Sequence, residues 1–264
     1  MKSHDHQHIN KDPLADSAGV PWDGRAFNEN PFANDDGSAR PELISAIHEF
    51  HQTGDATNVF AEFSKSRLLI PLLADLGESG EGAHGQTVDK SADLSIVNVE
   101  TPDGQVGLPV FSSVDSMKLW NSTARPVPSD AIRVALAAAS EGNTRIILDP
   151  GSETEFAFRR AAIAAMAQQQ TWNPPHLSVL VTAEFEKGLA NEDAIAKVVI
   201  SSLDPQSRLA GPEVKVELQV VAGLNKEQLE EVLHRVTQNW AESEIISSSV
   251  DSMALVVKPA ENKS

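Results

Sequence analysis

Apolar residues recur three and four positions apart in two neighbouring segments, residues 43–50 and 59–63, which a break at residues 53–55 separates. This spacing places the apolar side chains on one face of a helix, so the sequence predicts two short helices. The apolar run that follows, residues 68–73, has the length of a strand. Because Pro71 has no N–H to donate to a neighbouring strand, we expect this strand at a sheet edge or a bulge.

A turn sequence separates the next two apolar segments. Thr-Pro-Asp-Gly at residues 101–104 is typical of a tight turn, so the flanking segments, residues 94–97 and 106–111, are predicted to form an antiparallel hairpin. Residues 77–91, which precede the hairpin, are rich in glycine and are predicted to form a loop.

Serine residues mark the starts of two further helices. Ser112 or Ser113 can cap a helix that runs through Trp120, because a serine hydroxyl accepts a hydrogen bond from the free N–H groups of the first turn. In the same way, Ser129 can cap a helix that ends at Gly142. The sequence therefore predicts one helix on each side of the segment 121–128.

A buried-type strand at residues 144–148 stops at Asp-Pro-Gly, residues 149–151. Ser152 and Glu155 then have the spacing of a capping box, in which each side chain bonds to the backbone N–H of the other. We therefore predict a helix over residues 156–166, directly after the strand and its turn.

A stiff connector and a domain boundary are predicted at residues 172–175, where Trp-Asn is followed by two prolines. The pattern beyond this point predicts strands at residues 177–185, 214–221 and 253–257, with helices at 191–203 and 225–242. The second helix is the clearest, because its apolar residues recur on one face. The order is that of a compact βαβαβ unit.

The chain divides into three segments. Residues 1–21 are polar and lack apolar periodicity, so we expect a disordered tail. Residues 22–173 are predicted to form a first domain and residues 174–264 a smaller second one. Because strands alternate with helices, the predicted class is α/β (α+β), with a mixed sheet and flanking helices in the first domain and the βαβαβ unit in the second.

The composition of the 264-residue chain narrows the classes of function. Twenty-one Lys and Arg against 38 Asp and Glu leave a formal net charge of −17. This charge repels phosphate backbones and anionic lipids, so we expect neither nucleic-acid nor membrane binding. The apolar runs fall short of the about 20 residues that a spanning helix needs, and the first residues resemble no secretion signal. We therefore expect a cytoplasmic protein.

Cysteine is absent, which excludes disulfides, thiol nucleophiles, iron–sulfur clusters and Cys-type zinc sites. His4, His6 and His8 alternate in the tail, but metal ligands need fixed hydrogen-bond partners behind them, so we interpret these residues as incidental. No G-x-G-x-x-G, Walker or G-x-S-x-G motif is present. We therefore predict no catalytic residues, no metal site and no cofactor.

The irregular stretch 22–41 carries two aromatic rings, Phe27 and Phe32, which we expect to hold it against the first domain. Its acidic cluster, with Asp36 and Gly37, resembles part of a calcium loop, but the later Glu and the flanking helices are missing. A turn held by side-chain hydrogen bonds is the preferred interpretation. Phe32, Asp36 and Gly37 are candidate binding residues.

Two loops near one end of the predicted sheet also offer binding groups. Asp149 and Gly151 lie where a strand is predicted to meet a helix, whose free N–H groups can bind an anion. A turn with a helix cap explains the same residues and is preferred. Trp120 and Arg125 bracket a second loop that can hold a carboxylate or a peptide. The equally weighted alternative places Trp120 in the core and pairs Arg125 with an acid.

Several stretches together carry a resemblance to a known family. They are Gly-Arg-Ala-Phe-Asn-Glu-Asn-Pro-Phe-Ala-Asn-Asp-Asp-Gly at residues 24–37, Ser-Arg-Leu-Leu-Ile-Pro at 66–71, Leu-Pro-Val-Phe-Ser-Ser at 108–113, Trp-Asn at 120–121, Ala-Arg-Pro-Val-Pro at 124–128 and Ile-Leu-Asp-Pro-Gly at 147–151. In combination they resemble the amino-terminal domain of the SseB family, the enhanced-serine-sensitivity proteins, in its actinobacterial form. The predicted second domain resembles that family's second domain in outline.

The resemblance supplies no catalytic residues to carry over. The leading hypothesis is a non-enzymatic, cytoplasmic binding or regulatory protein that docks an unidentified protein or small metabolite, and the family's name implies a link to serine metabolism. One alternative is an enzyme with an unrecognised site near Arg125 and Asp149. Another is a structural subunit of a homo-oligomer.

Overall fold

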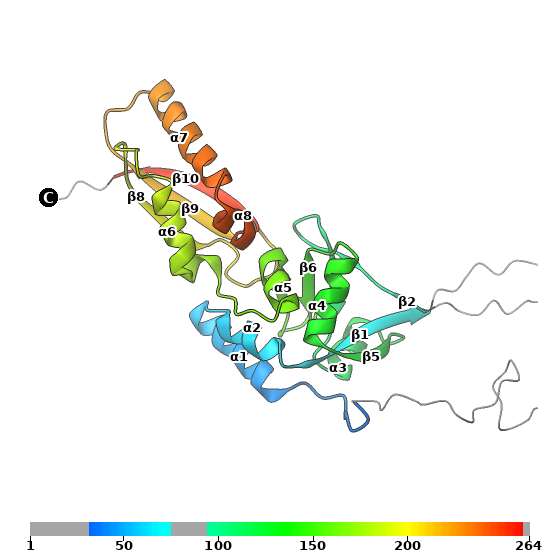
Figure 1. Ribbon diagram of the computed structural model, residues 1–264. Coiled ribbons are helices and arrows are strands. Elements are labelled where there is room, and N and C mark those ends of the chain that lie inside the picture. The colour runs from blue at the N-terminus through cyan, green and yellow to red at the C-terminus, as the bar shows by residue number, and fades with distance from the viewer. Residues whose placement is uncertain (1–31, 75–93, 261–264) are drawn as a thin grey trace, which may run out of the picture. The chain divides into compact units, whose positions relative to one another are not determined.

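The computed structural model describes residues 32–74 and 94–260 (Figure 1). Contacts divide the chain after Asp35, and the unit that begins at Asp36 contains the helices and strands given below. Helices accompany antiparallel and mixed sheets in this unit, which confirms the predicted α/β class. The predicted tail and the Gly-rich loop at residues 77–91 lie outside the described residues.

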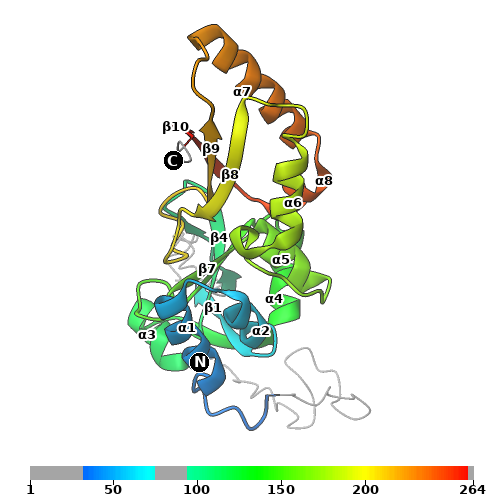
Figure 2. The ribbon, with the colours of Figure 1, turned by 90° about the vertical axis from the view of Figure 1, so that its left-hand side faces the viewer.

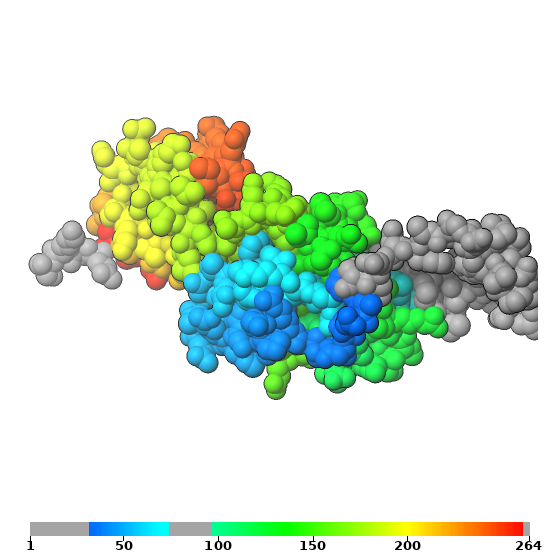
Figure 3. Space-filling model, turned by 60° about the horizontal axis from the view of Figure 1, so that its bottom comes forward, coloured from blue at the N-terminus to red at the C-terminus, as the bar shows by residue number. Residues whose placement is uncertain are grey.

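Two helices open this unit, as predicted. α1 (Pro41–Thr53) has proline in its first turn and ends at Gly54, which adopts the left-handed conformation with a φ of 74°. α2 (Thr57–Phe63) follows, and the buried residues of both helices are spaced as the sequence predicted. In the space-filling view, α1 and α2, coloured blue to cyan, form part of one face of this unit (Figure 3).

The first sheet has three strands, and β1 (Arg67–Ala74) is the central one. It pairs antiparallel with β2 (Leu94–Ile96) on one side and with β5 (Arg125–Asp130) on the other. The prediction that β1 lies at an edge is therefore wrong. β5 was not predicted, because Pro126 and Pro128 weaken a strand pattern; as an edge strand, it can accommodate both prolines.

Proline is tolerated in the central strand β1 because it lies between two segments that bond to the same flank of β1, Phe111 and β2. Leu69 exchanges both backbone hydrogen bonds with Phe111, at 2.8 and 2.9 Å, whereas the pairing with β2 begins only at Leu72. Backbone N–H groups along a strand alternate in direction, so Pro71 has its nitrogen on the same flank as Leu69. It lies between the two partners on that flank, where a missing N–H leaves no ladder bond unmade.

The second sheet has the strand order β3-β4-β6-β7, with β4 and β6 parallel and the outer pairs antiparallel. Its strands are β3 (Val99–Glu100), β4 (Val106–Val110), β6 (Arg145–Leu148) and β7 (Phe156–Arg159). The hairpin predicted around the Pro-Asp-Gly turn is confirmed as β3–β4. It is shorter than predicted, because the apolar segment that forms β2 pairs with β1 instead.

The two helices predicted on either side of segment 121–128 are present, and one of them is capped by a residue other than the predicted one. α3 (Val114–Trp120) begins at Ser113, whose hydroxyl accepts a first-turn N–H at 3.0 Å, as predicted. α4 (Ala131–Ser140) is capped by Asp130 rather than by Ser129, and its carboxylate accepts a first-turn N–H at 2.9 Å. Aspartate and serine cap helices about equally well, so the sequence did not distinguish the two neighbours.

The helix predicted over residues 156–166 is a strand followed by a shorter helix. β7 (Phe156–Arg159) pairs antiparallel with β6, and α5 (Arg160–Ala167) starts only after it. Instead of closing a capping box, Glu155 accepts the Gly151 N–H at 2.6 Å. The capping-box prediction is therefore wrong, because the segment closes a β-hairpin.

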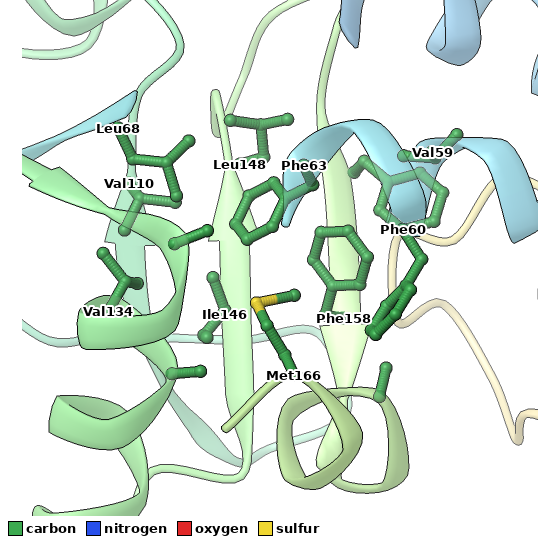
Figure 4. Packing of buried hydrophobic residues seen from close by; sticks show 14 of the residues in the cluster. Val59, Phe60, Phe63, Leu68, Val110, Val134, Ile146, Leu148, Phe158 and Met166 are labelled. Carbon is green, nitrogen blue, oxygen red and sulfur yellow. The ribbon is translucent and has the colours of Figure 1, made fainter. Parts of the chain in front are cut away.

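One apolar core joins these helices to the strands. Figure 4 shows Phe60 and Phe63 of α2 and Met166 of α5 gathered around Phe158 of β7 and Ile146 of β6. The rings of Phe63 and Phe158 have their centroids 4.5 Å apart. Burial of aromatic and branched side chains contributes most of the stabilisation of such a layer, about 1.5–3 kcal/mol for each side chain.

The carboxy-terminal part is a three-stranded sheet with helices on one side (Figure 2). Its elements in chain order are η1 (Pro175–Leu177), α6 (Val179–Lys187), β8 (Ile195–Ser202), β9 (Val214–Val220), α7 (Lys226–Ala241), α8 (Glu244–Ser249) and β10 (Met253–Pro259). β9 is central, antiparallel to β8 and parallel to β10. The predictions for β9, α7 and β10 are confirmed, whereas the first strand and first helix of the predicted βαβαβ order are interchanged.

The segment 177–185, predicted as a strand, is mostly helix because its apolar residues do not all face one core. Val181 and Phe185, four positions apart, are buried, whereas Val179 and Leu180 are 82% and 70% exposed. A helix allows this split between two faces, and the Ser178 hydroxyl caps it at 3.3 Å.

The segment 191–203, predicted as a helix, contains β8. Val198 and Ile200 of β8 lie opposite Leu218 and Val216 of β9, in an antiparallel register. Branched side chains favour strands when a neighbouring strand is present to pack against, and the sequence did not reveal that neighbour.

Two buried arginines face each other across the β6–β7 pair. Arg145 and Arg159 are register partners, and like charges in this position destabilise a sheet unless counter-ions separate them. Three aspartates from separate segments supply the counter-ions. Asp251 accepts two hydrogen bonds from Arg145, at 2.8 and 3.0 Å, and Asp103 accepts a third at 2.9 Å. Asp204 accepts a hydrogen bond from Arg159 at 2.7 Å.

This ion-pair cluster, which consists of two arginines and three aspartates, joins the β3-β4-β6-β7 sheet to the carboxy-terminal part. Asp204 and Asp251 belong to the carboxy-terminal part, whereas both arginines belong to the amino-terminal sheet. The two large apolar cores are separate, one drawn from residues 43–172 and the other from residues 181–250, but a small cluster of Ile147, Ala157 and Leu209 also crosses between the two parts. The predicted boundary at residues 172–175 adjoins the end of the first core, and the division into two domains stays a prediction.

Changing Asp251 to Asn removes the charge that pairs with Arg145 but keeps the side chain's size. We expect the free energy of unfolding to fall by about 3 kcal/mol, because a buried guanidinium loses its principal counter-ion. Denaturant melts measure this loss. Glu230→Gln, which breaks the exposed Lys226–Glu230 pair, is the control and should change stability far less. Equal effects of the two variants would contradict the role given to the cluster.

Glu213 lies beside the cluster, and its carboxylate accepts the Asp251 N–H at 2.7 Å. Burial raises the pKa of Glu213 from 4.5 to about 7, because the charged form loses water. A carboxyl whose pKa is raised by folding stabilises the folded state below its unfolded pKa. This contribution is lost as the pH rises through the folded pKa, here near neutrality.

Glu213→Gln should therefore change how stability depends on pH. Between about pH 5 and 8, we expect the unmodified protein to lose about 2 kcal/mol of stability relative to the variant, whose amide does not titrate. Denaturant melts of both proteins at the two pH values give this difference directly. A stability difference that stays constant with pH would show that Glu213 does not titrate in this range.

Candidate functional site

The candidate residues Asp36 and Gly37 form a turn against the start of α3. The Asp36 carboxylate accepts the Ser38 hydroxyl and N–H, at 2.6 and 2.9 Å, and these hydrogen bonds lower its pKa. Gly37 has a φ of 79°, and its carbonyl accepts the Val114 N–H at 2.8 Å. A Cβ at Gly37 would lie 2.7 Å from the Val114 side chain, so this turn requires glycine. The turn interpretation is confirmed.

Asp149 is fully buried after β6, at the carboxyl end of the parallel β4–β6 pair. Its Oδ1 accepts the Ser112 N–H at 2.8 Å, and its Oδ2 accepts the hydroxyls of Ser112 at 2.6 Å and Thr154 at 2.8 Å. Burial raises the pKa of Asp149, and these hydrogen bonds oppose the shift. The carboxylate thus ties together the loops that follow β4 and β6.

Gly151 is exposed in the hairpin loop after Asp149. It has a φ of 81°, and the next helix, α5, begins only at Arg160. The helix amino terminus that would have bound an anion here is therefore not formed, and that part of the prediction is wrong. A role for Asp149 or Gly151 in binding stays a prediction.

Trp120 and Arg125 have different environments. Trp120 is half-buried, and its ring lies 5.3 Å from the ring of Phe111 in a small apolar cluster, which favours the core interpretation. Arg125 is exposed at the start of β5, and no acidic group among the described residues pairs with it. The alternative in which Arg125 pairs with an acid therefore has no support in the described part of the chain.

Phe32 is half-buried in a turn in which the Asp35 N–H donates to the Phe32 carbonyl at 3.1 Å. The unit to which it belongs ends at Asp35, and Phe27 lies outside the described residues. The proposed anchoring of this stretch by its two rings stays a prediction.

The structure brings some of these residues together around the start of α3. Gly37 bonds to Val114, and Asp149 bonds to Ser112, two residues earlier in the chain. None of the seven candidate residues lines any of the three main cavities in the described part of the chain. The largest, of about 600 Å³, lies over the ion-pair cluster, where the cations of Arg145 and Arg159 already bind aspartates.

A second cavity, of about 350 Å³, lies where the chain leaves α5, and it is the best candidate for a binding site. We call it the Trp172 cavity. It is lined by Thr57, Phe60, Ala61, Ser64, Lys65, Ile132, Met166, Gln169, Gln170, Thr171, Trp172 and Asn173. An apolar wall with a few polar groups and a volume of roughly 300–1,000 Å³ is typical of small-molecule sites.

Two aromatic rings form one wall of the Trp172 cavity. The rings of Phe60 and Trp172 have their centroids 5.5 Å apart, with their planes tilted by 40°. Phe60 also packs against Phe158 at 6.4 Å, which fixes its ring, and Trp172 is partly buried against the same core. A planar or branched apolar group can pack against such a wall.

The backbone at Gln169 is strained and directs the chain toward this wall. Gln169 has a φ of 56°, in the left-handed region. The Gln169 N–H donates to Met166 at 3.0 Å and the Gln170 N–H to Ala165 at 2.8 Å, which is the helix-ending motif that normally carries glycine. Strain of this kind collects at functional sites. The left-handed conformation of Gln169 turns the chain after α5, three residues before Trp172.

The polar groups of the cavity can both donate and accept hydrogen bonds. Gln169, Gln170 and Asn173 carry side-chain amides, and Lys65 is the only charged residue in its lining. The Lys65 ammonium pairs with Glu62 at 2.7 Å, which partly neutralises it. The cavity therefore suits an apolar group with a polar end. No three His, Asp or Glu side chains form a metal-binding group in the part of the chain that the structure describes.

Sequence reasoning missed this cavity because Trp172 was interpreted as part of a connector. The available signal was a single large aromatic residue between three glutamines and two prolines. Such a residue in a polar connector needs an apolar surface to pack against, and that surface comes from α2, α4 and α5.

Changing Gln169 to Gly should stabilise the protein by about 0.5–1 kcal/mol. Glycine removes the cost of the left-handed backbone, and its greater freedom in the unfolded chain offsets part of the gain. Gln168→Gly is the control: residue 168 has a φ of −88°, so glycine there should only destabilise. Denaturant melts compare the two. If Gln169→Gly destabilises the protein as much as Gln168→Gly, the backbone at Gln169 is not strained.

Comparison with known proteins gave one match. Residues 43–165 match the family model described as SseB protein N-terminal domain, a range that runs from α1 into α5. No curated protein and no solved structure matches the chain. Among the described helices, none has the length and apolar character needed to cross a membrane. The matched range includes α2 and α4, which line the Trp172 cavity, and ends before Trp172.

Proposed function

Because this chain belongs to the SseB family through its domain at residues 43–165, we propose that it is a non-enzymatic binding or regulatory protein that holds its ligand in the Trp172 cavity. The ligand is a compound or side chain with a planar or branched apolar group and a polar end. The protein acts in the cytoplasm, and the family's name suggests that its ligand belongs to amino-acid metabolism.

The observation that carries this proposal is the composition of the cavity. Phe60, Ile132, Met166 and Trp172 supply apolar surface, and amide groups lie close by on the same loop as Trp172. Apolar surface provides affinity, and a few polar groups orient the ligand. The volume of about 350 Å³ accommodates a group of one or two rings.

The position of the cavity is a second support. Its loop, residues 169–173, connects the core of the amino-terminal part to the segment that leads into α6. Trp172 also lines a different, smaller cavity of about 40 Å³ together with Glu213 and Asp204. A ligand that displaces the Trp172 indole would therefore change the surroundings of Glu213 and Asp204, beside the ion-pair cluster. This arrangement suits a regulatory protein in which ligand binding alters the contacts between two parts of the chain.

The environment of Asp149 argues against the alternative of an enzyme with a site near Arg125 and Asp149. Both carboxylate oxygens of Asp149 accept hydrogen bonds from Ser112 or Thr154, and the side chain is fully buried. A general acid or base must reach a substrate atom directly or through one water molecule. Asp149 instead holds two loops together, and Arg125 lies exposed on an edge strand.

The test is to fill the cavity without disturbing the helix that lines it. Ala61 is a half-exposed residue of α2, and arginine is a good helix former, so Ala61→Arg should fold and occlude the cavity. Ala139→Arg, at an exposed position of α4 outside the cavity lining, is the matched control. The probes are the fluorescent dye anilinonaphthalene sulfonate and each of the twenty amino acids.

We expect the unmodified protein and Ala139→Arg to bind the dye at one site, and at least one amino acid to raise their melting temperature. A ligand at 100 times its Kd adds about 2.7 kcal/mol of stability. Ala61→Arg should lose both effects. The proposal fails if the unmodified protein binds no probe, or if Ala61→Arg responds to the probes as the control does.

A further inference from the structure

The outer edge of β10 is an edge of the carboxy-terminal sheet with an unbroken register. β10 (Met253–Pro259) pairs with β9 over seven register positions, and no strand within residues 32–74 and 94–260 pairs with its other side. Its backbone groups on that side are free to bond to another strand. Figure 2 shows α6, α7 and α8 on one side of the sheet.

The other sheet edges are protected in ways that β10 lacks. β5 carries Pro126 and Pro128, and β8 has an irregular register at Ile195 and Lys197. Ser207 covers β7 by accepting the Ala157 N–H at 2.7 Å, and β2 and β3 have only three and two residues. Prolines, bulges, coverage and short length are the usual protections of an edge. β10 has a regular register and carries its proline at the last position.

Apolar side chains follow this edge with a period of two. Met253, Leu255 and Val257 are 41%, 37% and 37% exposed. They are register partners of Val214, Val216 and Leu218, which are buried under the helices, so they lie on the same side of the sheet. The apolar layer of the carboxy-terminal core therefore continues to the open edge.

We propose that β10 pairs antiparallel with β10 of a second copy of this chain, in a two-fold register centred on Leu255. In this register, Leu255 lies opposite its own copy and Met253 lies opposite Val257. The partly exposed apolar side chains of the two copies then cover each other, and the two sheets form one sheet of six strands. Cross-strand apolar pairs of this kind stabilise a sheet.

The two-fold apolar register favours a second copy as the occupant, and the charges along the strand do not oppose it. Lys258, the only charged residue of β10, falls opposite Ser252 in this register, so no like charges meet across the strands. The formal net charge of −17 on each copy opposes association at long range, and salt screens such repulsion beyond about 8–10 Å. Dimerisation should therefore strengthen as salt is added.

The test compares two substitutions of the same chemistry at exposed leucines. Leu255→Lys places a charge at the centre of the proposed interface, and Leu180→Lys places it on α6, away from β10. Sedimentation velocity across a wide range of protein concentration measures the mass, and circular dichroism verifies folding. We expect a dimer for the unmodified protein and for Leu180→Lys, and a folded monomer for Leu255→Lys.

Three outcomes would overturn the proposal: a monomer at every concentration for the unmodified protein, a dimer that persists in Leu255→Lys, or a Leu180→Lys protein as monomeric as Leu255→Lys. A strand partner of another kind would give the first outcome. If Leu255→Lys does not fold, hydrogen exchange of the unmodified protein decides. The β10 amides should exchange more slowly in the dimer, and equal rates at high and low concentration would also overturn the proposal. This edge is separate from the Trp172 cavity, so Ala61→Arg should leave the mass unchanged.

Discussion

Arg145 and Arg159, which lie opposite each other on β6 and β7, require counter-ions that bring the β3-β4-β6-β7 sheet against the carboxy-terminal part. Two buried guanidinium groups cannot share one face of a hairpin without counter-ions. Asp103 comes from the β3–β4 turn, whereas Asp204 and Asp251 come from the carboxy-terminal part. The β3-β4-β6-β7 sheet therefore neutralises only part of its buried charge through Asp103, and the two carboxy-terminal aspartates neutralise the rest. The ion pairs at this joint are accompanied by a small apolar contact of Leu209 with Ile147 and Ala157, and the two large apolar cores lie on either side of it.

The candidate site lies close to this joint. Trp172 packs on the amino-terminal core through Phe60 and also borders a small cavity that Glu213 and Asp204 line. Glu213 has a pKa raised to about 7, so its charge changes at pH values near neutrality. Ligand binding in the Trp172 cavity and protonation beside the ion-pair cluster would therefore act on neighbouring groups. This proximity supports a binding and regulatory role within the SseB family better than a catalytic one.

The buried charged groups of this fold hold its segments together, whereas its partly exposed apolar groups are available for contacts with other molecules. Asp149 holds the loops after β4 and β6 through three hydrogen bonds, as the ion-pair cluster holds the two sheets. Both centres use charged groups whose hydrogen bonds are satisfied inside the chain, so neither offers free groups to a partner. Among the described residues, apolar groups remain partly exposed in the Trp172 cavity and along the edge of β10, the two surfaces that we propose for recognition.

Local patterns in the sequence predict the α/β class, the helices α1 to α4, the β3–β4 turn and the elements β9, α7 and β10. Each of these follows from local spacing, capping or turn residues, which act within a few positions of the chain. The resemblance to the SseB family comes from short sequence stretches in the same way. The remaining features depend on contacts between distant segments. The segment 156–159 became a strand because Arg145 and its neighbours supplied a partner, and Val198 and Ile200 became part of β8 because β9 lies beside them. The Trp172 cavity likewise exists only where α2, α4 and α5 meet. Contacts between distant segments leave no periodic signal in the sequence, so such features appear only once the chain is folded.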